Sequence, residues 1–239
     1  MPRRGSVNVL TRELRPEAMD DPALEPGRHR HALRGLSRLN ALSGSSRILW
    51  PSIAKLARSE GRALRILDLA SGAGDVPLGL WRRARRAGVE LDIHGVDVSP
   101  RAVGFAREHA ERLGAAVRFD VLDVLAEPLP EDCDVVLSSL FLHHVTEAEA
   151  VLLLAKMRHA ARRVVLINDL LRSARGLALA HVAARMFTSS KIVHFDAPRS
   201  VRASFTAIEM KELARRAEMG SARISRHWPL RLLLTWMAA

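Results

Sequence analysis

The stretch Leu64-Arg-Ile-Leu-Asp-Leu-Ala-Ser-Gly-Ala-Gly-Asp75 decides the fold of this chain. Its mostly apolar first half predicts a strand that is buried on both faces in a parallel sheet. Gly72 and Gly74 predict a turn that leads into a helix beginning near Val76. Glycine lets backbone N–H groups approach a ligand closely, and the amino end of a helix favours an anionic group. The alternative is an ordinary strand-to-helix turn that happens to hold two glycines, because short glycine patterns are common.

Downstream of this turn, predicted strands alternate with predicted helices. We expect strands over 91–97, 116–121, 133–140 and 163–169, and helices over 76–86, 99–113 and 147–159. A capping-box pattern from Thr206 to Glu209 opens a later helix, and the chain ends in two strands, over 222–228 and 230–237. This alternation predicts an α/β fold with a doubly wound, mainly parallel sheet whose ligands bind at the carboxyl ends of the strands.

Two segments lie outside this alternation. Residues 1–60 are interpreted as a charged arm followed by a helical cap, in which Leu33, Leu36, Leu39 and Leu42 form one apolar stripe ending near Gly44. A second helix follows, with Pro51 either near its first turn or kinking it. The domain proper occupies 61–239 in the same structural unit. Residues 171–204 read as an insertion, an apolar helix and then a loop over 189–202. This insertion is either a lid over a lipophilic substrate or simply a packed helix.

The composition limits which partners and which cellular compartment the protein can be expected to have. The formal net charge is +11, which fits nucleic acid, an anionic membrane surface or background amino-acid usage. Because the arginines are scattered and no aromatic residues are interleaved with them, background usage is favoured over nucleic acid. Cys133 alone cannot form an intramolecular disulfide or a cysteine metal cluster, which fits a reducing compartment. With no signal-like start and no apolar run near the ~20 residues of a membrane span, we expect a soluble, cytoplasmic protein; peripheral membrane contact and the oligomeric state stay open.

Three successive predicted strands end in, or just before, an aspartate: Asp68, Asp97 and Asp123. A carboxylate after the second strand can accept hydrogen bonds from both hydroxyls of a ribose. Asp123 could accept from an exocyclic amine of adenine with Val124 beside the ring, while Asp68 and Asp75 flank the turn, where an ammonium group or a backbone donor could be held. For any one of these residues taken alone, a helix cap or a turn is the simpler interpretation.

These motifs resemble those of the class I S-adenosylmethionine-dependent methyltransferases, and the likeness runs from Arg65 to the end. The chain departs from the family at Ala70, where a glycine is usual, and it lacks the Gly-x-Gly-x-x-Gly spacing of dehydrogenases. The resemblance implies a seven-stranded sheet with an antiparallel last strand. It also implies S-adenosylmethionine as cofactor, held by Asp68, Ala70, Ser71, Gly72, Gly74, Asp97, Val98, Asp123, Val124 and Ser138.

A general base is needed if the methyl acceptor is a hydroxyl, and the candidates are His143, His144, Asp169 and His194. Neutral histidine can take a phenolic proton near pH 7, and His143 is the first choice ahead of Asp169. Many members of the family carry a histidine at the second position of the pair, so His144 is interpreted as partly structural. Asn168 and Asp169 resemble the metal-binding residues of catechol-type methyltransferases, but strand four ends in serines where those enzymes place an acid. We therefore predict no metal.

The resemblance is greatest to small-molecule O- and C-methyltransferases of the ubiquinone and menaquinone type. The expected function is methylation of a hydroxyl on a lipophilic phenol or quinol. The alternatives are C-methylation of a quinol ring, methylation of RNA, and a non-catalytic partner protein that keeps the fold. The residues after strand four, from Ser138 to Phe141, differ from the Asn or Asp, two prolines and an aromatic that are usual in amino-directed nucleic-acid enzymes.

Overall fold

The computed structural model describes residues 11–15, 25, 27 and 44–238, and the predicted stripe of leucines over 33–42 lies outside this part. Seven strands form one sheet in the order β3-β2-β1-β4-β5-β7-β6. All neighbours are parallel except the pairs that β7 makes with β5 and β6. The strands are β1 (Leu64–Leu69), β2 (Leu91–Asp97), β3 (Val117–Val121), β4 (Cys133–Ser139), β5 (Ala161–Leu170), β6 (Arg223–His227) and β7 (Arg231–Met237). The doubly wound sheet and its antiparallel last strand confirm the predicted fold.

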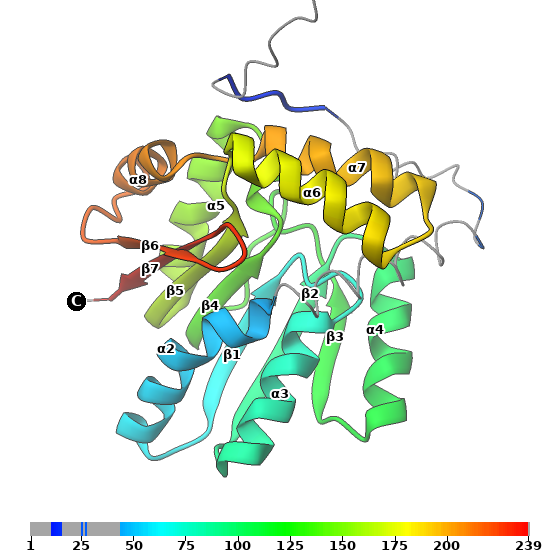
Figure 1. Cartoon of the computed structure of the whole chain (residues 1–239). Helices are drawn as coiled ribbons and strands as arrows, with labels where there is room; N and C mark the ends of the chain where they lie inside the picture. Colours follow the sequence, from blue (N-terminus) through cyan, green and yellow to red (C-terminus); the bar gives the residue numbers. More distant parts are fainter. Residues whose placement is uncertain (1–10, 16–24, 26, 28–43, 239) are drawn as a thin grey trace, which may run out of the picture.

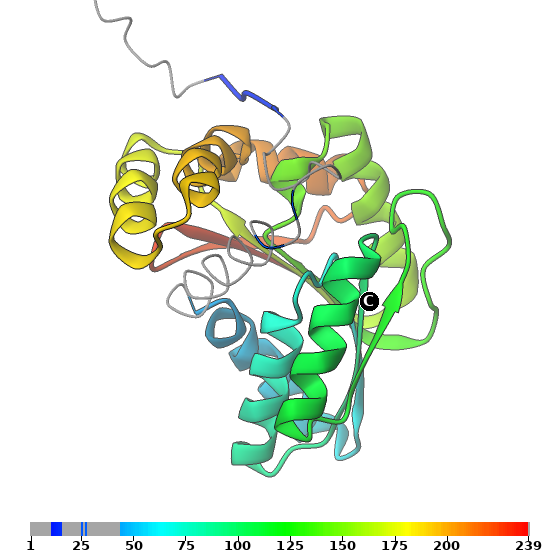
Figure 2. The same cartoon turned by 90° about the vertical axis from the view of Figure 1, so that its right-hand side faces the viewer.

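Helices cover both faces of the sheet (Figures 1 and 2). One face packs against α2 (Ser45–Glu60), α3 (Asp75–Ala87) and α4 (Pro100–Leu113), and the other against α5 (Glu147–Ala160) and α8 (Ala207–Arg216). The local signals read from the sequence fix several of these helices. Ser99 accepts a hydrogen bond from the N–H of Ala102 and so caps α4, and Thr206 forms the predicted capping box with Glu209.

The insertion after β5 consists of two helices, α6 (Ala174–Phe187) and α7 (Lys191–Ala203), which pack against each other above the carboxyl edge of the sheet (Figure 1). The predicted loop over 189–202 is therefore wrong. Pro198 argued for a loop because proline usually breaks a helix interior. Here Ser190 caps the helix by accepting from the N–H of Val193, and the buried face formed by Ile192, Val193 and Val201 holds the helix against its neighbours.

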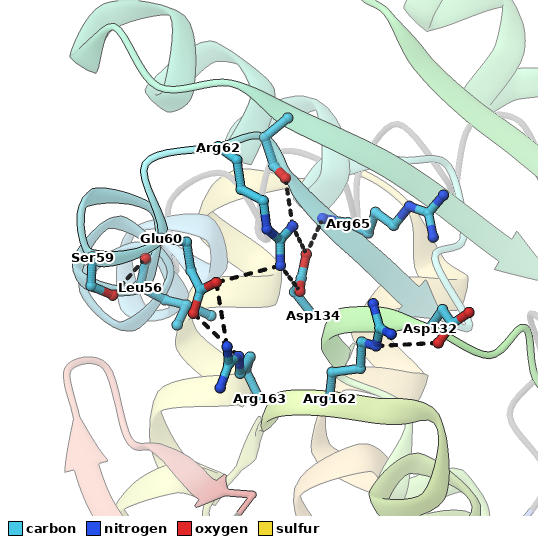
Figure 3. A network of polar contacts seen from close by, with 10 residues as sticks. Leu56, Ser59, Glu60, Arg62, Arg65, Asp132, Asp134, Arg162 and Arg163 are labelled. Carbon is cyan, nitrogen blue, oxygen red and sulfur yellow. Dashed lines mark hydrogen bonds and ion pairs between the residues drawn. The ribbon is translucent and has the colours of Figure 1, made fainter.

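The amino end of the sheet is held by an ionic network (Figure 3). Asp134, whose side chain is 1% exposed, accepts hydrogen bonds of 2.8 and 2.6 Å from the guanidinium of Arg62 and one of 2.9 Å from the N–H of Arg65. The bond from Arg62 is the main cause that lowers the pKa of the Asp134 carboxyl below its usual value. This network joins the chain before β1 to the start of β4, at the edge opposite to the predicted ligand edge.

Candidate cofactor and acceptor site

The turn after β1 lies at the carboxyl edge of the sheet and has an unusual backbone. Ala70, Gly72 and Gly74 have φ values of 54°, 55° and 79°, in the left-handed region that favours glycine. A Cβ at Gly74 would lie 2.8 Å from the ring of Phe119, so only glycine fits there. At Gly72, by contrast, an added Cβ would meet no atom of the described residues within 4 Å. The backbone of the turn is therefore open on the side of Gly72, where a ligand can approach closely.

Asp97 ends β2 beside this turn. Its Oδ2 accepts from the N–H of Gly72 at 2.8 Å, and its Oδ1 accepts from the N–H of Ser99 at 2.9 Å. A carboxylate has about four lone-pair positions, so each oxygen retains one for a further donor. The two backbone bonds hold the carboxylate still, in an orientation that suits a pair of ribose hydroxyls.

Asp68 is a buried acid whose charge is not balanced by its neighbours. Its side chain is 1% exposed, and neither carboxylate oxygen has a hydrogen-bond partner within the described part of the chain. Burial, and secondarily the charge of Asp97, raises the pKa of the Asp68 carboxyl well above its usual value. A buried ionised carboxylate is costly unless a cation or donors satisfy it. The site therefore fits a ligand with an ammonium group at this point, as S-adenosylmethionine has.

The remaining predicted cofactor residues divide into two groups. Asp123 and Val124 follow β3; the Oδ1 of Asp123 accepts from the N–H groups of Leu125 and Ala126, so contact with an adenine amine would fall to Oδ2. Val98 is 62% exposed at the same edge, and its apolar surface suits contact with a base. Ser138, by contrast, is buried and donates to the carbonyl of Leu69, which gives it a structural role between β4 and β1.

Ser71 is the second serine among the predicted cofactor residues. Its N–H donates to the carbonyl of Val96, and its buried Oγ has no partner among the described residues. The Oγ faces Gly95 of β2, where an added Cβ would lie 2.9 Å from it, so the hydroxyl fills the space that this glycine leaves.

His143 and Asp169, predicted separately as bases, are brought together by the structure. His143 lies in η2 (Leu142–His144), and its Nδ1 is 2.6 Å from Asp169 Oδ1 at the end of β5. The backbone N–H of His143 also donates to Asp169 Oδ2 at 3.0 Å. Burial alone would raise the pKa of the Asp169 carboxyl, but His143, the N–H of Leu170 and the charge of Arg231 together lower it. The carboxylate thus holds the imidazole ring through its Nδ1 atom. If His143 acts as a base, the nitrogen that accepts the proton is therefore Nε2.

The other two histidines have different surroundings. The ring of His144 lies 4.3 Å from that of His143, centroid to centroid, and stacks with Phe141 at 6.2 Å. His194 lies on α7, and its Nε2 is 2.7 Å from the carbonyl oxygen of Thr188 at the end of α6. This contact ties the two helices of the insertion together and gives His194 a structural role.

Sequence reasoning missed Arg12, in the described part of the N-terminal arm. Its guanidinium donates to the carbonyls of Ala203, His143 and Val145 and stacks 3.9 Å from the ring centroid of Phe205. The arm therefore fastens η2 to the end of α7. A lone arginine in a charged arm carries no sequence signal for such a contact. Sequence reasoning also missed Arg231, which opens the mostly apolar β7.

The doubly wound sheet, the open glycine turn and the acids at its edge define a nucleoside-cofactor-binding domain of the class I methyltransferase type. The comparison with protein families gives the particular family. Residues 60–218 match the family described as "Methyltransferase domain", and the chain belongs to it. The cofactor of this family is S-adenosylmethionine, and the buried, partnerless Asp68 beside the glycine turn fits it.

Among curated proteins, the chain is 40% identical over 96 residues to a demethylmenaquinone methyltransferase of Thermus thermophilus. The match covers 40% of this chain and 41% of that protein. Among solved structures, the S-adenosylmethionine-dependent methyltransferase SibL is similar with a TM-score of 0.62 and 20% identity, over 89% of this chain and 59% of SibL. The magnesium protoporphyrin IX methyltransferase ChlM of Synechocystis PCC 6803, with bound SAH, gives 0.53 and 15% identity, over 89% and 84%. At these identities the structural likeness shows the fold alone.

No described helix has both the length and the apolar content needed to cross a membrane. In the same part of the chain, no group of three or more His, Cys, Asp or Glu side chains could hold a metal ion.

Proposed function

We propose that this protein transfers the methyl group of S-adenosylmethionine to a hydroxyl group on a lipophilic phenol or quinol. The observation that carries the proposal is the His143–Asp169 pair at the carboxyl edge of the sheet, 2.6 Å apart. A buried carboxylate that holds one imidazole nitrogen keeps the ring in the tautomer and orientation in which the other nitrogen can accept a proton.

The cofactor residues would work as follows. Asp97 would accept from the ribose hydroxyls, Asp68 from the ammonium group, and the backbone around Gly72 would lie against the ligand. The cofactor supplies a methyl group on a positively charged sulfur, which is already a strong electrophile. The protein therefore has mainly to align the acceptor with that group and to exclude water.

His143 would supply the remaining step. As the acceptor oxygen takes the methyl group, the hydroxyl proton moves to Nε2 of His143, and Asp169 stabilises the resulting imidazolium. The balance is one methyl ether formed, one proton stored on the imidazole and one neutral thioether released. Helices α6 and α7, which lie above this edge (Figure 1), would cover the acceptor.

The test is a panel of phenols and quinols incubated with purified protein and S-adenosylmethionine, with products identified by mass spectrometry. Methyl ethers of one or more acceptors are expected. Binding of the cofactor without turnover of any phenol or quinol would contradict the proposal and favour the non-catalytic partner protein.

A second candidate is C-methylation of a quinol ring. The specific observation in its favour is the match to a demethylmenaquinone methyltransferase, although it covers only 40% of this chain. Proton NMR of the product separates the two, because a methyl group on oxygen and one on a ring carbon resonate at well-separated shifts.

A further inference from the structure

A row of polar side chains crosses three neighbouring strands at the carboxyl edge of the sheet. Ser139 of β4 pairs with Asn168 of β5, and Arg231 of β7 pairs with Leu170, two residues beyond Asn168. Because side chains alternate along a strand, Ser139, Asn168 and Arg231 lie on one face, and Asn168 and Arg231 are diagonal neighbours. On the same face, the next residues away from the carboxyl edge are Leu137, Leu166 and Leu233. They belong to the apolar core between the sheet and helices α2 and α3.

The polar row is buried but incompletely satisfied. Asn168 is 0% exposed, and its Nδ2 donates to the Oγ of Ser139 at 2.8 Å, which fixes the amide orientation. Its Oδ1 has no partner among the described residues, and the same holds for Nε and Nη1 of Arg231, which is 6% exposed. Buried donors and acceptors are nearly always paired in folded proteins, and an unpaired charged donor is the most costly case. One acceptor and two cationic donors in the same row therefore indicate a ligand.

The charge of Arg231 is not neutralised by a bonded carboxylate in the described structure. The acid whose charge acts on it is Asp169, which pairs with Leu232 and so lies on the opposite face of the sheet. Asp169 is already engaged by His143 and by the N–H of Leu170. Burial lowers the pKa of Arg231 to about 10, which still leaves a cation at neutral pH. An anionic partner would satisfy this buried charge.

The polar row adjoins the cofactor site. Asp68 of β1 pairs with Leu137, the residue two positions before Ser139, so Asp68 lies on the same face as the polar row. Asp68, which would hold the charged end of the cofactor, and Arg231 thus lie on the same face and at the same edge of the sheet. The two strands β4 and β5 separate them. A molecule at the polar row would lie next to the cofactor, where the methyl acceptor belongs.

We propose that Arg231 and Asn168 bind an acidic oxygen function of the methyl acceptor, such as a carboxylate or enolate placed beside the hydroxyl. Arg231 donates to the acidic oxygens, and Asn168 Oδ1 accepts from a further donor of the acceptor, where it has one, and not from the hydroxyl whose proton passes to His143. The assignment of this ligand as the acceptor rests on the proposed function, whereas the anion site itself does not. Acceptors with an acidic group next to the reacting hydroxyl are then preferred over their neutral counterparts.

The experiment is calorimetric binding to the S-adenosylhomocysteine-loaded protein. The probes are salicylate, 2,3-dihydroxybenzoate and 2-hydroxy-1-naphthoate, each paired with its uncharged amide. The wild type should bind at least one acid roughly 10- to 100-fold more tightly than its amide, the range for a hydrogen bond to a charged group. Arg231→Gln should remove this preference. Arg226→Gln, which removes an exposed arginine from the neighbouring strand β6, is the matched control and should keep it.

Asn168→Asp is a second variant that changes little in shape. It places a competing carboxylate beside Arg231 and should abolish the preference for acids even if Arg231→Gln fails to fold. Equal binding of acid and amide in the wild type, binding of none of the six probes, or an unchanged preference in Asn168→Asp would each overturn the proposal. Acid binding that depends on Arg231, without methylation of any phenol, would instead leave the anion site standing and contradict the proposed function.

Discussion

Nδ1 of His143 lies 2.6 Å from Oδ1 of Asp169, and both side chains are almost fully buried. The residues are 26 positions apart in sequence and are joined because η2 folds back over the end of β5. The second oxygen of Asp169 accepts from the backbone N–H of His143, so the carboxylate holds both the ring and the main chain of this residue. Such a double attachment leaves little freedom for the imidazole.

His143→Ala is expected to lower the rate of methyl transfer by roughly 10²- to 10⁴-fold, the usual contribution of a general base. Cofactor affinity should stay unchanged, because no cofactor group is assigned to this ring. The measurements are initial rates of S-adenosylhomocysteine release and calorimetric binding of the same molecule. His159→Ala, which removes an exposed histidine from the last turn of α5, is the matched control and should keep full activity. Full activity of the His143 variant would show that the base has been wrongly assigned.

Asp97→Asn should weaken cofactor binding by roughly 100-fold, because two hydrogen bonds to a charged acceptor are each reduced. Asp92→Asn changes an exposed aspartate on the same strand and serves as the control. Calorimetry with S-adenosylhomocysteine measures both. Equal affinities for the two variants would remove Asp97 from the cofactor site.

The sequence alone indicates that the proposed cofactor residues lie together, because their arrangement depends on local signals. Strands that end in Asp68 and Asp97, a turn with Gly72 and Gly74, and the cap at Ser99 are all readable within a few residues of one another. Parallel strands then bring these carboxyl ends to one edge without further information.

The proposed acceptor half depends on contacts between distant segments, and these carry no local pattern. His143 and Asp169 were recognised as candidates, but their pairing depends on the path of η2. Arg12 reaches the carbonyl of His143 across 131 positions, and Arg231 becomes a diagonal neighbour of Asn168 only through the register of β5 and β7. Helix α7 was not predicted because Pro198 argued against a helix. The buried face that stabilises this helix can be recognised only once its neighbours are in place.

Ala70→Gly should stabilise the protein, because Ala70 has a φ of 54° and an L-residue in the left-handed region costs about 1 kcal/mol more than glycine there. The greater freedom of glycine in the unfolded chain offsets part of this gain, so we expect an increase of at most about 1 kcal/mol in the free energy of unfolding. Urea unfolding measures it. Ala70→Val should have the opposite effect, and a loss of stability in Ala70→Gly would contradict the argument.

Asp134→Ala should destabilise the fold by about 1–3 kcal/mol, because the N–H of Arg65 loses its acceptor and Arg62 loses its ion pair. The folded-state pKa of Asp134 is lowered, so its stabilisation is present above the unfolded-state value of about 4 and is lost as the pH falls through the folded value. The difference in unfolding free energy between wild type and variant should therefore shrink in acid. A difference that is independent of pH down to acid unfolding would argue against this ion pair.

Asp68→Asn tests the buried carboxylate proposed for the cofactor site. The pKa of this carboxyl is shifted in the opposite direction to that of Asp134. The folded-state pKa of Asp68 is raised, so the native protein binds this proton more tightly than the unfolded chain does. The free energy of unfolding of the cofactor-free wild type should then fall as the pH rises from about 4 through the folded value. The asparagine variant carries no charge here and should be more stable than the wild type at pH 7, with the difference vanishing in acid.

The asparagine variant should also gain less stability from S-adenosylhomocysteine, because an amide attracts an ammonium group less than a carboxylate does. Thermal unfolding at several pH values, with and without S-adenosylhomocysteine, measures both effects. A cofactor-free variant less stable than the wild type at pH 7, or an undiminished shift with the ligand, would mean that Asp68 is satisfied by the protein itself rather than by the cofactor.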